Sequence, residues 1–343
     1  MKLSHSSYGK YVTCPRAFKY HYLDKIRPIA NPSSLIFGSA VDAALNSIVM
    51  GTNDELKVLE TGLKKLAAPD VEFHKNDYDP ELLDEATMSE LQEKCDKIAG
   101  QKLELETLIP ILIDRPVDGL SQKQRQVLAA CCIASLKVKG QLMLEAYKRV
   151  VMPHIKRVVS SQEFINWKDE KGNQFTGVLD LVVDLDGHGE IPADNKTASR
   201  PYELDAVSKS TQLAIYSKVT GKTKAAFFVM DKTIKKNRIK ICQTCGFNGS
   251  GGRHKTCSNE VDGKRCEGEW IETIQPEANI QIIVDDVPEK VQQITMEALS
   301  ETAEAIKTGI FPRNLNACDN QYGRPCPYRE FCWRGDKAGL KKA

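Results

Sequence analysis

The central part of the chain carries apolar and polar segments in an order that predicts two paired strands. One apolar run of strand length spans 177–184 and a second spans 190–197, with an Asp- and Gly-rich turn at 186–189 between them. Two such runs joined by a short turn of this composition are typical of a β-hairpin. We therefore expect an antiparallel pair of strands within 177–197.

Further strands are predicted on both sides of this hairpin. The pattern at 158–166 indicates a strand, and the apolar run at 224–230 indicates a buried one. A strand rich in lysine and arginine follows at 232–240, and the segment 270–285 adds one or two more. Strand patterns are therefore concentrated after residue 158.

The region 50–150 is helical in character and holds no recognisable chemistry. Ser121 and Gln124 form a capping box that opens a long helix. The apolar stripe of this helix consists of Val127, Ala130, Cys131, Ala134, Val138 and Leu142. An acidic, proline-containing loop is expected at 69–84.

Two more helices are predicted after the hairpin. The first spans 202–221 and ends at Gly221, a residue favoured just after a helix. Pro288 opens the second, which ends at Gly309. The apolar stripe of the second helix consists of Val287, Val291, Ile294, Ala298 and Ile306.

Length, composition and charge limit the class of protein. The 343 residues suffice for one large domain with insertions or for two domains. With 41% hydrophobic and 27% charged residues, and no run of 18 or more apolar residues, the chain is typical of a soluble globular protein. The N-terminus lacks a signal-peptide apolar segment, so we expect a cytosolic protein without a membrane partner. Because the formal net charge is only +2, any nucleic-acid-binding surface must be a local patch.

The hairpin also carries the first candidate chemistry. Asp180, Asp194 and Lys196 are expected near strand ends. Two carboxylates and one ammonium group meeting there have the donors to bind Mg²⁺ or Mn²⁺ and to polarise a water molecule. A solvated hairpin with surface charges is the alternative.

The order Asp180, then Asp194-x-Lys196, then Gln212-x-x-x-Tyr216 resembles the PD-(D/E)XK nucleases, in particular their RecB-like branch. The resemblance implies an α/β fold with a central mixed sheet and helices on both faces. It also implies metal-dependent hydrolysis of DNA phosphodiester bonds, which we expect to be exonucleolytic.

The resemblance also gives these residues roles. Asp180 would bridge the metals, and Asp194 would bind one of them together with the carbonyl of Asn195. Lys196 would orient or help to deprotonate the attacking water. Gln212 and Tyr216 lie four residues apart, on one helical face, and would position the substrate strand.

Asp42 is a further candidate metal ligand. It lies among small residues at 37–45, where related nucleases usually have Gly-x-x-x-His with a metal-binding histidine. A carboxylate suits a hard cation at least as well as imidazole does. An exposed helical Asp without metal is the alternative. Glu163, on the strand predicted at 158–166, is another acidic residue that we consider for a place near the metals.

Eleven cysteines are more consistent with metal ligands than with disulfides in a cytosolic chain. Cys242-x2-Cys245 and Cys257-x8-Cys266 resemble a zinc ribbon inserted at 240–270, whose four thiolates would hold a structural Zn²⁺. His254 is an alternative ligand to Cys257. The remaining internal cysteines are expected to be ordinary core or surface positions of helices: Cys95, Cys131 and Cys132.

A second cysteine set joins the two ends of the chain. The motifs Ser6-x4-Tyr11-x2-Cys14-Pro15-x2-Phe18 and Cys326-Pro-Tyr-x3-Cys332 resemble those of iron–sulfur nucleases such as the CRISPR-adaptation nucleases and the nuclease half of AddB. With Cys318, the resemblance implies four thiolates for a 4Fe–4S cluster. The segment 310–335 would then close onto Cys14. A second zinc site is the alternative.

Taken together, these patterns predict one RecB-like nuclease domain over 1–343 with a helical insertion at 50–150 and a zinc-ribbon insertion at 240–270. Because no Walker motif is present, any helicase motor must be another polypeptide. We expect single-stranded DNA or duplex ends as partners, with a separate helicase or recombination protein, as for phage-encoded RecB-type exonucleases in a bacterial cytoplasm. A DNA-end-binding protein without catalysis and a zinc-ribbon regulatory module are the alternative functions.

Overall fold

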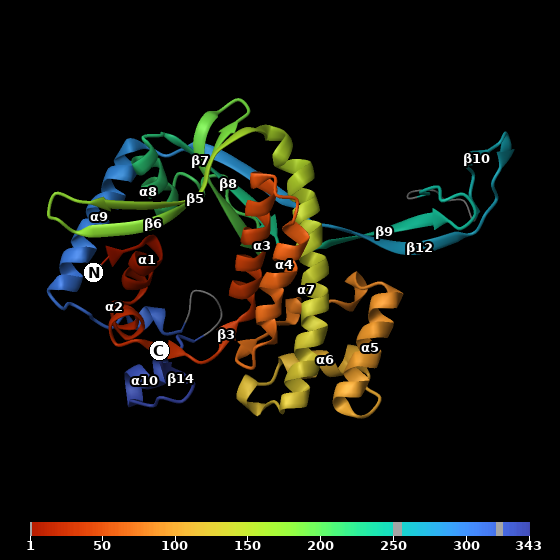
Figure 1. The fold of residues 1–343 in the computed structure, drawn as a ribbon, viewed down its shortest axis with the longest axis horizontal. Helices are drawn as coiled ribbons and strands as arrows, with labels where there is room; N and C mark the ends of the chain where they lie inside the picture. The colour runs from red at the N-terminus through yellow and green to blue at the C-terminus, as the bar shows by residue number, and fades with distance from the viewer. Residues whose placement is uncertain (1, 250–255, 320–324) are drawn as a thin grey trace.

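A mixed β-sheet forms the centre of the protein, whose computed structural model describes residues 2–249, 256–319 and 325–343 (Figure 1). The strands of this sheet are β1 (Lys2–Leu3), β5 (Ile155–Lys168), β6 (Gln174–Leu185), β7 (Gly189–Ala198), β8 (Lys224–Asp231) and β13 (Ile280–Asp286). The order across the sheet is β1-β6-β7-β8-β13, and β5 pairs with β6. β7 and β8 run parallel, whereas β6 is antiparallel to both β5 and β7. The predicted α/β fold with a central mixed sheet is confirmed.

The predicted hairpin consists of β6 and β7. Its backbone pairs run from Leu181 with Ala193 to Leu185 with Gly189. Gly187 and Gly189 have φ values of 75° and 71°, a conformation that glycine adopts without steric cost. The glycines therefore allow the tight turn that sets the register of the two strands.

Helices cover both faces of the sheet (Figure 1). One face is covered by α3 (Ser33–Met50), α4 (Glu55–Leu63) and α7 (Gln122–Val150), with α5 (Glu85–Ala99) and α6 (Leu105–Ile113) packed outside them. The other face carries α1 (His5–Thr13), α8 (Thr211–Thr220) and α9 (Glu289–Lys307). Each face has its own cluster of buried apolar side chains, so the sheet separates two hydrophobic layers.

The long helix α7 ties the segment 50–150 to the sheet. It begins with the predicted capping box, in which Ser121 and Gln124 exchange hydrogen bonds between side chain and backbone. Its Tyr147 ring packs edge-on against Phe228 of β8, with ring centroids 6.1 Å apart. Buried residues of α3, α4, α5, α6 and α7 belong to one cluster with those of β6, β7 and β8. The helical segment therefore shares a core with the sheet.

Two helices, α3 and α7, are long and apolar enough to cross a membrane by length and composition alone. Both contribute to the core, because Val41 and Leu45 of α3 and Leu136 and Met143 of α7 are buried. Core helices of soluble domains pass the same test, so packing against the sheet accounts for their apolar character.

The segment 69–84, predicted as a loop, lies against α7. It contains β4 (Val71–Glu72), which pairs in parallel with β3 (Asn31–Pro32), and two short 3₁₀ turns at Lys75–Asp77 and Pro80–Leu82. The backbone N–H of Asp79 donates to Ser135 Oγ at 3.0 Å. This hydrogen bond attaches the loop to the middle of α7.

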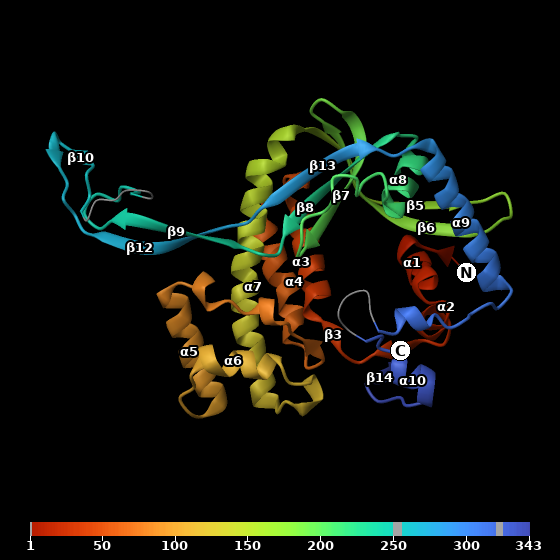
Figure 2. The same ribbon diagram turned by 180° about the vertical axis from the view of Figure 1, so that it is seen from behind.

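The two ends of the chain lie side by side (Figure 2). The elements involved are α2 (Pro15–Phe18), a π-helical turn (Lys19–Leu23), β2 (Ile26–Pro28), α10 (Arg329–Arg334) and β14 (Leu340–Lys342). β2 and β14 pair antiparallel, and the Tyr328 hydroxyl donates to the backbone oxygen of Ile26 at 3.1 Å. Residues separated by about 300 positions thus pack together.

A two-stranded arm extends away from the body of the protein (Figure 1). It is formed by β9 (Lys235–Cys242) and β12 (Trp270–Glu277), which pair antiparallel along their whole length. Near its tip lie the short strands β10 (Glu260–Val261) and β11 (Lys264–Arg265). The predicted 240–270 insertion therefore lies at the end of this arm.

The helix predicted at 202–221 begins later than expected. The residues before Ser210 form turns, and α8 begins at Thr211. Ser210 Oγ accepts a hydrogen bond from the backbone N–H of Leu213, so the first free N–H groups of the helix are capped at this point. The end is as predicted, because Gly221 follows α8 with φ of 68°.

The face that α9 buries also differs from the prediction. Ile294 is 51% exposed, whereas Gln292 is buried beside Leu299. Gln292 Nε2 donates to the backbone oxygen of Val287 at 2.9 Å and so satisfies a buried carbonyl near the start of the helix. Because Gln292 is buried and Ile294 is exposed, the buried face of α9 differs from the predicted apolar stripe.

Candidate active site

Asp180 and Asp194 oppose each other at the point where β6 and β7 separate. The last backbone pair of these strands joins Leu181 to Ala193. One further step in the same register would pair Asp180 with Asp194, but the ladder ends before it. The structure therefore brings together two predicted carboxylates at a fork in the sheet.

The fork lies beside a short uncovered edge of β6. On that edge β7 covers the strand from Leu181 onward, while β1 covers only Gln174 and Phe175. In the stretch of β6 between these two pairings, Tyr216 of α8 donates its hydroxyl hydrogen to the backbone oxygen of Val178 at 2.7 Å. A side chain from α8 thus provides the hydrogen bond that a backbone carbonyl of the uncovered strand edge would otherwise lack, close to Asp180.

Asp42 reaches the fork from α3. A Cβ atom on Gly38, one turn earlier, would lie 3.3 Å from Thr197 Oγ1, so α3 approaches β7 closely at Gly38. One turn after Asp42, Asn46 accepts a hydrogen bond from Ser161 Oγ of β5. The face of α3 that carries Asp42 is thus fixed against the sheet by contacts on both sides.

Electrostatics show that the carboxylates are close together. Burial, followed by the neighbouring Asp194 carboxylate, raises the pKa of Asp180 to about 8. Burial and the charge of Asp180 raise the pKa of Asp42 to about 6, although Lys196 opposes this shift. Several acidic groups therefore compete for one positive charge at the fork.

Lys196 supplies that positive charge from β7. Its Nζ lies 2.5 Å from Asp194 Oδ2 and donates to Gln212 Oε1 at 2.9 Å. Gln212 Nε2 in turn donates to the Tyr216 hydroxyl oxygen at 2.8 Å. A chain of hydrogen bonds therefore runs from Lys196 through both predicted residues of α8 to the backbone of β6.

The donor set at the fork fits a divalent cation. The Asp194 side chain is 0% exposed, its Oδ2 is ion-paired with the Lys196 ammonium group, and no hydrogen-bond donor to its Oδ1 is found among the described residues. A buried carboxylate with free oxygen lone pairs is costly unless a cation is bound. Asp42 and Asp180 add oxygen donors, the type that Mg²⁺ and Mn²⁺ prefer.

Asn195 lies between Asp194 and Lys196 on β7. Its side chain points to the opposite face of the strand, as the alternation of a strand requires, and its Oδ1 is buried. The Tyr147 hydroxyl of α7 is buried on the same face, where burial and the charge of Asp42 raise its pKa and its contact with the Asn195 side chain opposes the shift. Sequence reasoning missed Tyr147, because it lies outside the apolar stripe predicted for this long helix.

Gln162 is a second residue that sequence reasoning missed. Its Nε2 donates to Asp42 Oδ2 at 3.4 Å, and its φ of 52° is unusual for a residue other than glycine. A left-handed conformation in a strand, opposite Asp180, requires local strain of about 1–3 kcal/mol. Its neighbour Glu163, the residue considered from sequence, is exposed and pairs in the sheet with Leu179.

His5 also lies near the site, on the first turn of α1. Its Nε2 is 3.0 Å from Thr211 Oγ1 at the start of α8. Burial and the positive charge of Lys196 lower the pKa of His5. No sequence motif marks this residue, since its proximity depends on packing between elements 206 positions apart.

Four cysteines cluster at the tip of the arm. The Sγ atoms of Cys242, Cys245, Cys257 and Cys266 all lie within 4.8 Å of one another. Two sulfur pairs, Cys242 with Cys266 and Cys245 with Cys257, are each separated by 3.6 Å. The predicted four-cysteine cluster is therefore present. The alternative ligand His254 lies outside the described residues.

The backbone around Cys242 is shaped for a thiolate. Burial raises the pKa of its thiol, but N–H groups of Cys245 and Thr244 outweigh that effect and lower the pKa to about 6. A Cβ atom on Gly268 would lie 2.6 Å from Cys242 Sγ, so only glycine lets the second loop approach this sulfur. The N–H groups favour an ionised sulfur that can bind a metal, and Gly268 leaves room for the second loop beside it.

The terminal cysteines lie in the region where the chain ends meet. Cys14 and Cys326 pack around Tyr328, and the thiols of Cys318 and Cys14 both raise the pKa of Cys326 after burial. Cys332 Sγ accepts a hydrogen bond from Arg313 Nε at 3.2 Å. Residues 320–324, between Cys318 and Cys326, lie outside the described part of the chain.

Comparison with known proteins gives one match. The sequence profile of the PD-(D/E)XK nuclease superfamily matches residues 2–333, nearly the whole chain. No curated protein sequence matches the chain significantly.

Proposed function

The chain belongs to the PD-(D/E)XK nuclease superfamily, and from this premise we propose that it is a metal-dependent deoxyribonuclease that degrades DNA from an end. Membership of the superfamily implies a nucleic-acid substrate and hydrolysis. The observation that carries the proposal is the convergence of Asp42, Asp180 and Asp194 on Lys196 at the fork of β6 and β7. This arrangement is suited to hydrolysis of a phosphodiester bond.

The acidic residues would hold Mg²⁺ or Mn²⁺. Asp180 interacts electrostatically with both other carboxylates. Its charge raises the pKa of Asp42, and Asp194 raises the pKa of Asp180. It is therefore our candidate for the bridging ligand, with the backbone carbonyl of Asn195 as an additional donor. When bound, a divalent cation stabilises the negative charge that develops on the phosphate.

Lys196 would act on the attacking water. Its ammonium group is held between Asp194 Oδ2 and Gln212 Oε1, so its N–H bonds have a defined direction. In that position it would orient the water and stabilise negative charge on the attacking oxygen. Gln212 and Tyr216 hold this geometry through their own hydrogen bonds and would contact the substrate strand.

The decisive experiment is a time course on end-labelled single-stranded and double-stranded DNA with EDTA, Mg²⁺ or Mn²⁺. We expect no cleavage in EDTA and progressive loss of the labelled end in either metal. A circular single-stranded substrate without ends should resist degradation. DNA binding without cleavage in both metals would contradict the proposal and favour a non-catalytic DNA-end-binding protein or a zinc-ribbon regulatory module.

We also propose that the four-cysteine cluster holds a structural Zn²⁺. Tetrahedral zinc with Zn–S bonds of about 2.3 Å requires sulfur atoms about 3.8 Å apart. The distances of 3.6 Å in two pairs are close to that value. An iron–sulfur cluster at the same cysteines is the alternative, and metal analysis of the purified protein distinguishes the two.

For Cys14, Cys318, Cys326 and Cys332 we propose a 4Fe–4S cluster, as in the iron–sulfur members of the RecB-like branch. The support is the meeting of both chain ends, where burial and the neighbouring Cys318 and Cys14 raise the pKa of Cys326. A second zinc ion is the alternative. We further propose a role in DNA recombination or repair in the cytoplasm of a bacterium or a phage-infected bacterium, with a separate helicase or recombination protein as partner.

A further inference from the structure

A cavity of about 660 Å³ lies beside the candidate active site, on the face of the sheet covered by α3 and α7. Its walls come from the first turn of α3, the middle of α7, the loop at 74–77 and the residues that follow β7 and β8. Leu35, Phe37 and Leu136 make part of the wall apolar, while Lys139, Lys232 and Ser199 add polar groups. Cavities of this size and mixed lining bind small organic ligands.

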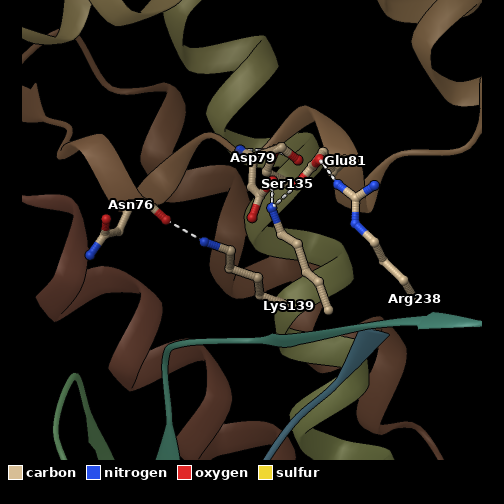
Figure 3. Close-up of polar contacts among 7 residues, drawn as sticks. Asn76, Asp79, Glu81, Ser135, Lys139 and Arg238 are labelled. Atoms are coloured by element: carbon tan, nitrogen blue, oxygen red, sulfur yellow. Dashed lines mark hydrogen bonds and ion pairs between the residues drawn. The ribbon is translucent and has the colours of Figure 1, made fainter. Parts of the chain in front are cut away.

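Lys139 is a buried cation in this wall. It is 6% exposed, and its ammonium donates to the backbone oxygen of Asn76 in the neighbouring loop (Figure 3). Asp79, whose charge also acts on Lys139, is ion-paired with Lys236 at 2.8 Å. Burial lowers the pKa of Lys139, although the charges of Asp79 and Asp77 oppose this shift.

Lys232 is the second cation, just after β8. Its backbone N–H donates to the backbone oxygen of Ala198, which places it at the end of β7. No hydrogen bond or ion pair of its side chain is found among the described residues, and burial lowers its pKa as well. Lys232 is partly buried and Asp77 offsets only some of the effect of burial on its pKa, so an anion in the cavity would stabilise its ammonium group.

One carboxylate offsets part of this charge. Asp77 is buried and lines the same cavity. It accepts hydrogen bonds from Ser33 Oγ at 2.5 Å and from the backbone N–H of His74 at 2.7 Å. Two lysines and one carboxylate leave one net positive charge. The first turn of α3 contains no acidic residue, so its N-terminal dipole adds to the positive potential.

The cavity lies a short distance from the proposed scissile bond. Ser199 is three residues beyond Lys196, which corresponds to about 10 Å along an extended chain. Leu35 is seven residues before Asp42, which corresponds to about 10 Å along a helix. Phosphates along one stacked strand are spaced about 3.4 Å along the helix axis, so about three nucleotides span this distance.

We propose that this cavity binds the terminal nucleotide of the DNA strand through a phosphate monoester at the strand end. Lys139 and Lys232 contact the phosphate, and the apolar wall contacts the base and sugar. This inference rests on the proposed nuclease function and adds the recognition of one chemical kind of strand end. It implies that the products are short oligonucleotides, because the bond at Lys196 lies a few nucleotides from the cavity.

Binding without cleavage tests the cavity separately from catalysis. Oligonucleotides with a 5′-phosphate, a 3′-phosphate or only hydroxyl ends are titrated in EDTA and in Ca²⁺, with fluorescence anisotropy as the measurement. We expect one phosphorylated end to bind at least about tenfold more tightly than the hydroxyl end, as a hydrogen bond between charged groups supplies. Equal affinity for all three oligonucleotides would overturn the inference.

Variants assign the preference to the cavity. Lys232→Gln should abolish the preference for the phosphorylated end, and Lys232→Arg should retain it. Lys224→Gln is the matched control, because this exposed lysine lies at the opposite end of the same strand. Lys139→Met tests the second lysine, but its burial makes a folding defect a risk, so Lys232→Gln decides. A preference that survives Lys232→Gln would contradict the assignment.

Two further measurements separate the alternatives. Deoxyadenosine monophosphate and inorganic phosphate are added as competitors. If the nucleotide binds in a Lys232-dependent way while strand ends show no preference, the cavity is a free-nucleotide site and the strand-end inference is wrong. If end preference is present but Mg²⁺ and Mn²⁺ give no cleavage, the nuclease proposal fails while the binding site stands.

Discussion

The ammonium group of Lys196 donates to Gln212 Oε1 over 2.9 Å, and this contact joins β7 to α8 across the candidate site. Gln212 is itself held by its hydrogen bond to Tyr216, whose hydroxyl is anchored to the backbone of Val178. The conformation of Lys196 is therefore set by a second element and not by its own strand alone. Water activation and lysine orientation can be tested separately.

Removal of Lys196 should abolish cleavage but leave DNA binding intact. Lys196→Ala deletes the group that orients water, while Asp42, Asp180 and Asp194 remain available for metal. Losing such a group typically reduces the rate by about 10²–10⁴-fold. Single-turnover cleavage and anisotropy in Ca²⁺ measure the two properties. Lys218→Ala, an exposed change on α8, serves as control. Cleavage by Lys196→Ala within a few-fold of wild type would contradict the mechanism.

Removal of Gln212 should give a smaller loss than removal of Lys196. In Gln212→Ala the lysine keeps its charge but loses one hydrogen bond that fixes its direction, worth about 1.5–3 kcal/mol. We expect kcat to fall about tenfold or more while KM changes less. Tyr216→Phe removes the hydroxyl that joins Gln212 to the backbone oxygen of Val178. Its kcat should lie between those of wild type and Gln212→Ala. If both variants matched wild type in kcat, the hydrogen-bond chain would have no role in positioning.

Asp42 should determine how much metal the protein needs. Asp42→Ala removes one oxygen donor, so activity should fall and higher Mg²⁺ concentrations should restore part of it. Asp42→His should keep partial activity with a preference for Mn²⁺, since imidazole is a softer ligand. Initial rates as a function of each metal concentration measure this. Rates that are unchanged in both variants would show that Asp42 is not at the metal.

Stability without metal should depend on pH in a predictable direction. The folded-state pKa values of about 6 for Asp42 and about 8 for Asp180 lie above the ordinary value of 3.8. The folded protein therefore binds more protons than the unfolded chain between about pH 4 and pH 8, and stability is lost as pH rises through this interval. In EDTA, Tm should fall from pH 5 to pH 8.

Metal should reverse this trend, because binding requires the carboxylates in their ionised form. The rise in Tm on adding Mg²⁺ should therefore be larger at pH 8 than at pH 5. Asp180→Asn should flatten the dependence in EDTA, since it removes the group with the largest shift. The same slope in Asp180→Asn and wild type would show that the carboxylate at the fork does not control stability.

The hairpin could be predicted from sequence because its information is local. Apolar runs, an Asp/Gly turn and the two-residue alternation place Asp194 and Lys196 on one face of β7. The open edge of β6 could not be predicted in the same way. It exists because β1 pairs with Gln174 and Phe175, a contact between residues more than 170 positions apart.

The other residues missed at the site depend on tertiary structure for the same reason. Tyr147 lies on α7 outside the predicted apolar stripe and becomes part of the site only because that helix lies against the sheet. Gln162 contacts Asp42 from a left-handed backbone conformation that no strand pattern encodes. The buried face of α9 was predicted wrongly at Ile294, because hydropathy alone does not anticipate that Gln292 satisfies backbone carbonyls.

The two cysteine sets should bind different metals and respond to different substitutions. Cys242 lies within a compact group of four sulfur atoms, whereas Cys14 packs near Cys326, and a cluster there would close a loop of about 300 residues. In the chain-entropy account of crosslinks, closing such a loop stabilises the fold by about 5 kcal/mol. An anaerobic preparation should be brown, with about four iron and one zinc per chain.

Single substitutions assign each metal to its site. Cys14→Ser should remove the visible absorption and lower solubility while zinc stays bound, because the crosslink between the chain ends is lost and the arm is untouched. Cys242→Ser should remove zinc and leave iron, because the arm projects away from the chain ends (Figure 1). Visible spectra and metal analysis measure both outcomes. A colourless anaerobic protein with two zinc ions would refute the iron–sulfur assignment and leave the site at Asp180, Asp194 and Lys196 unaffected.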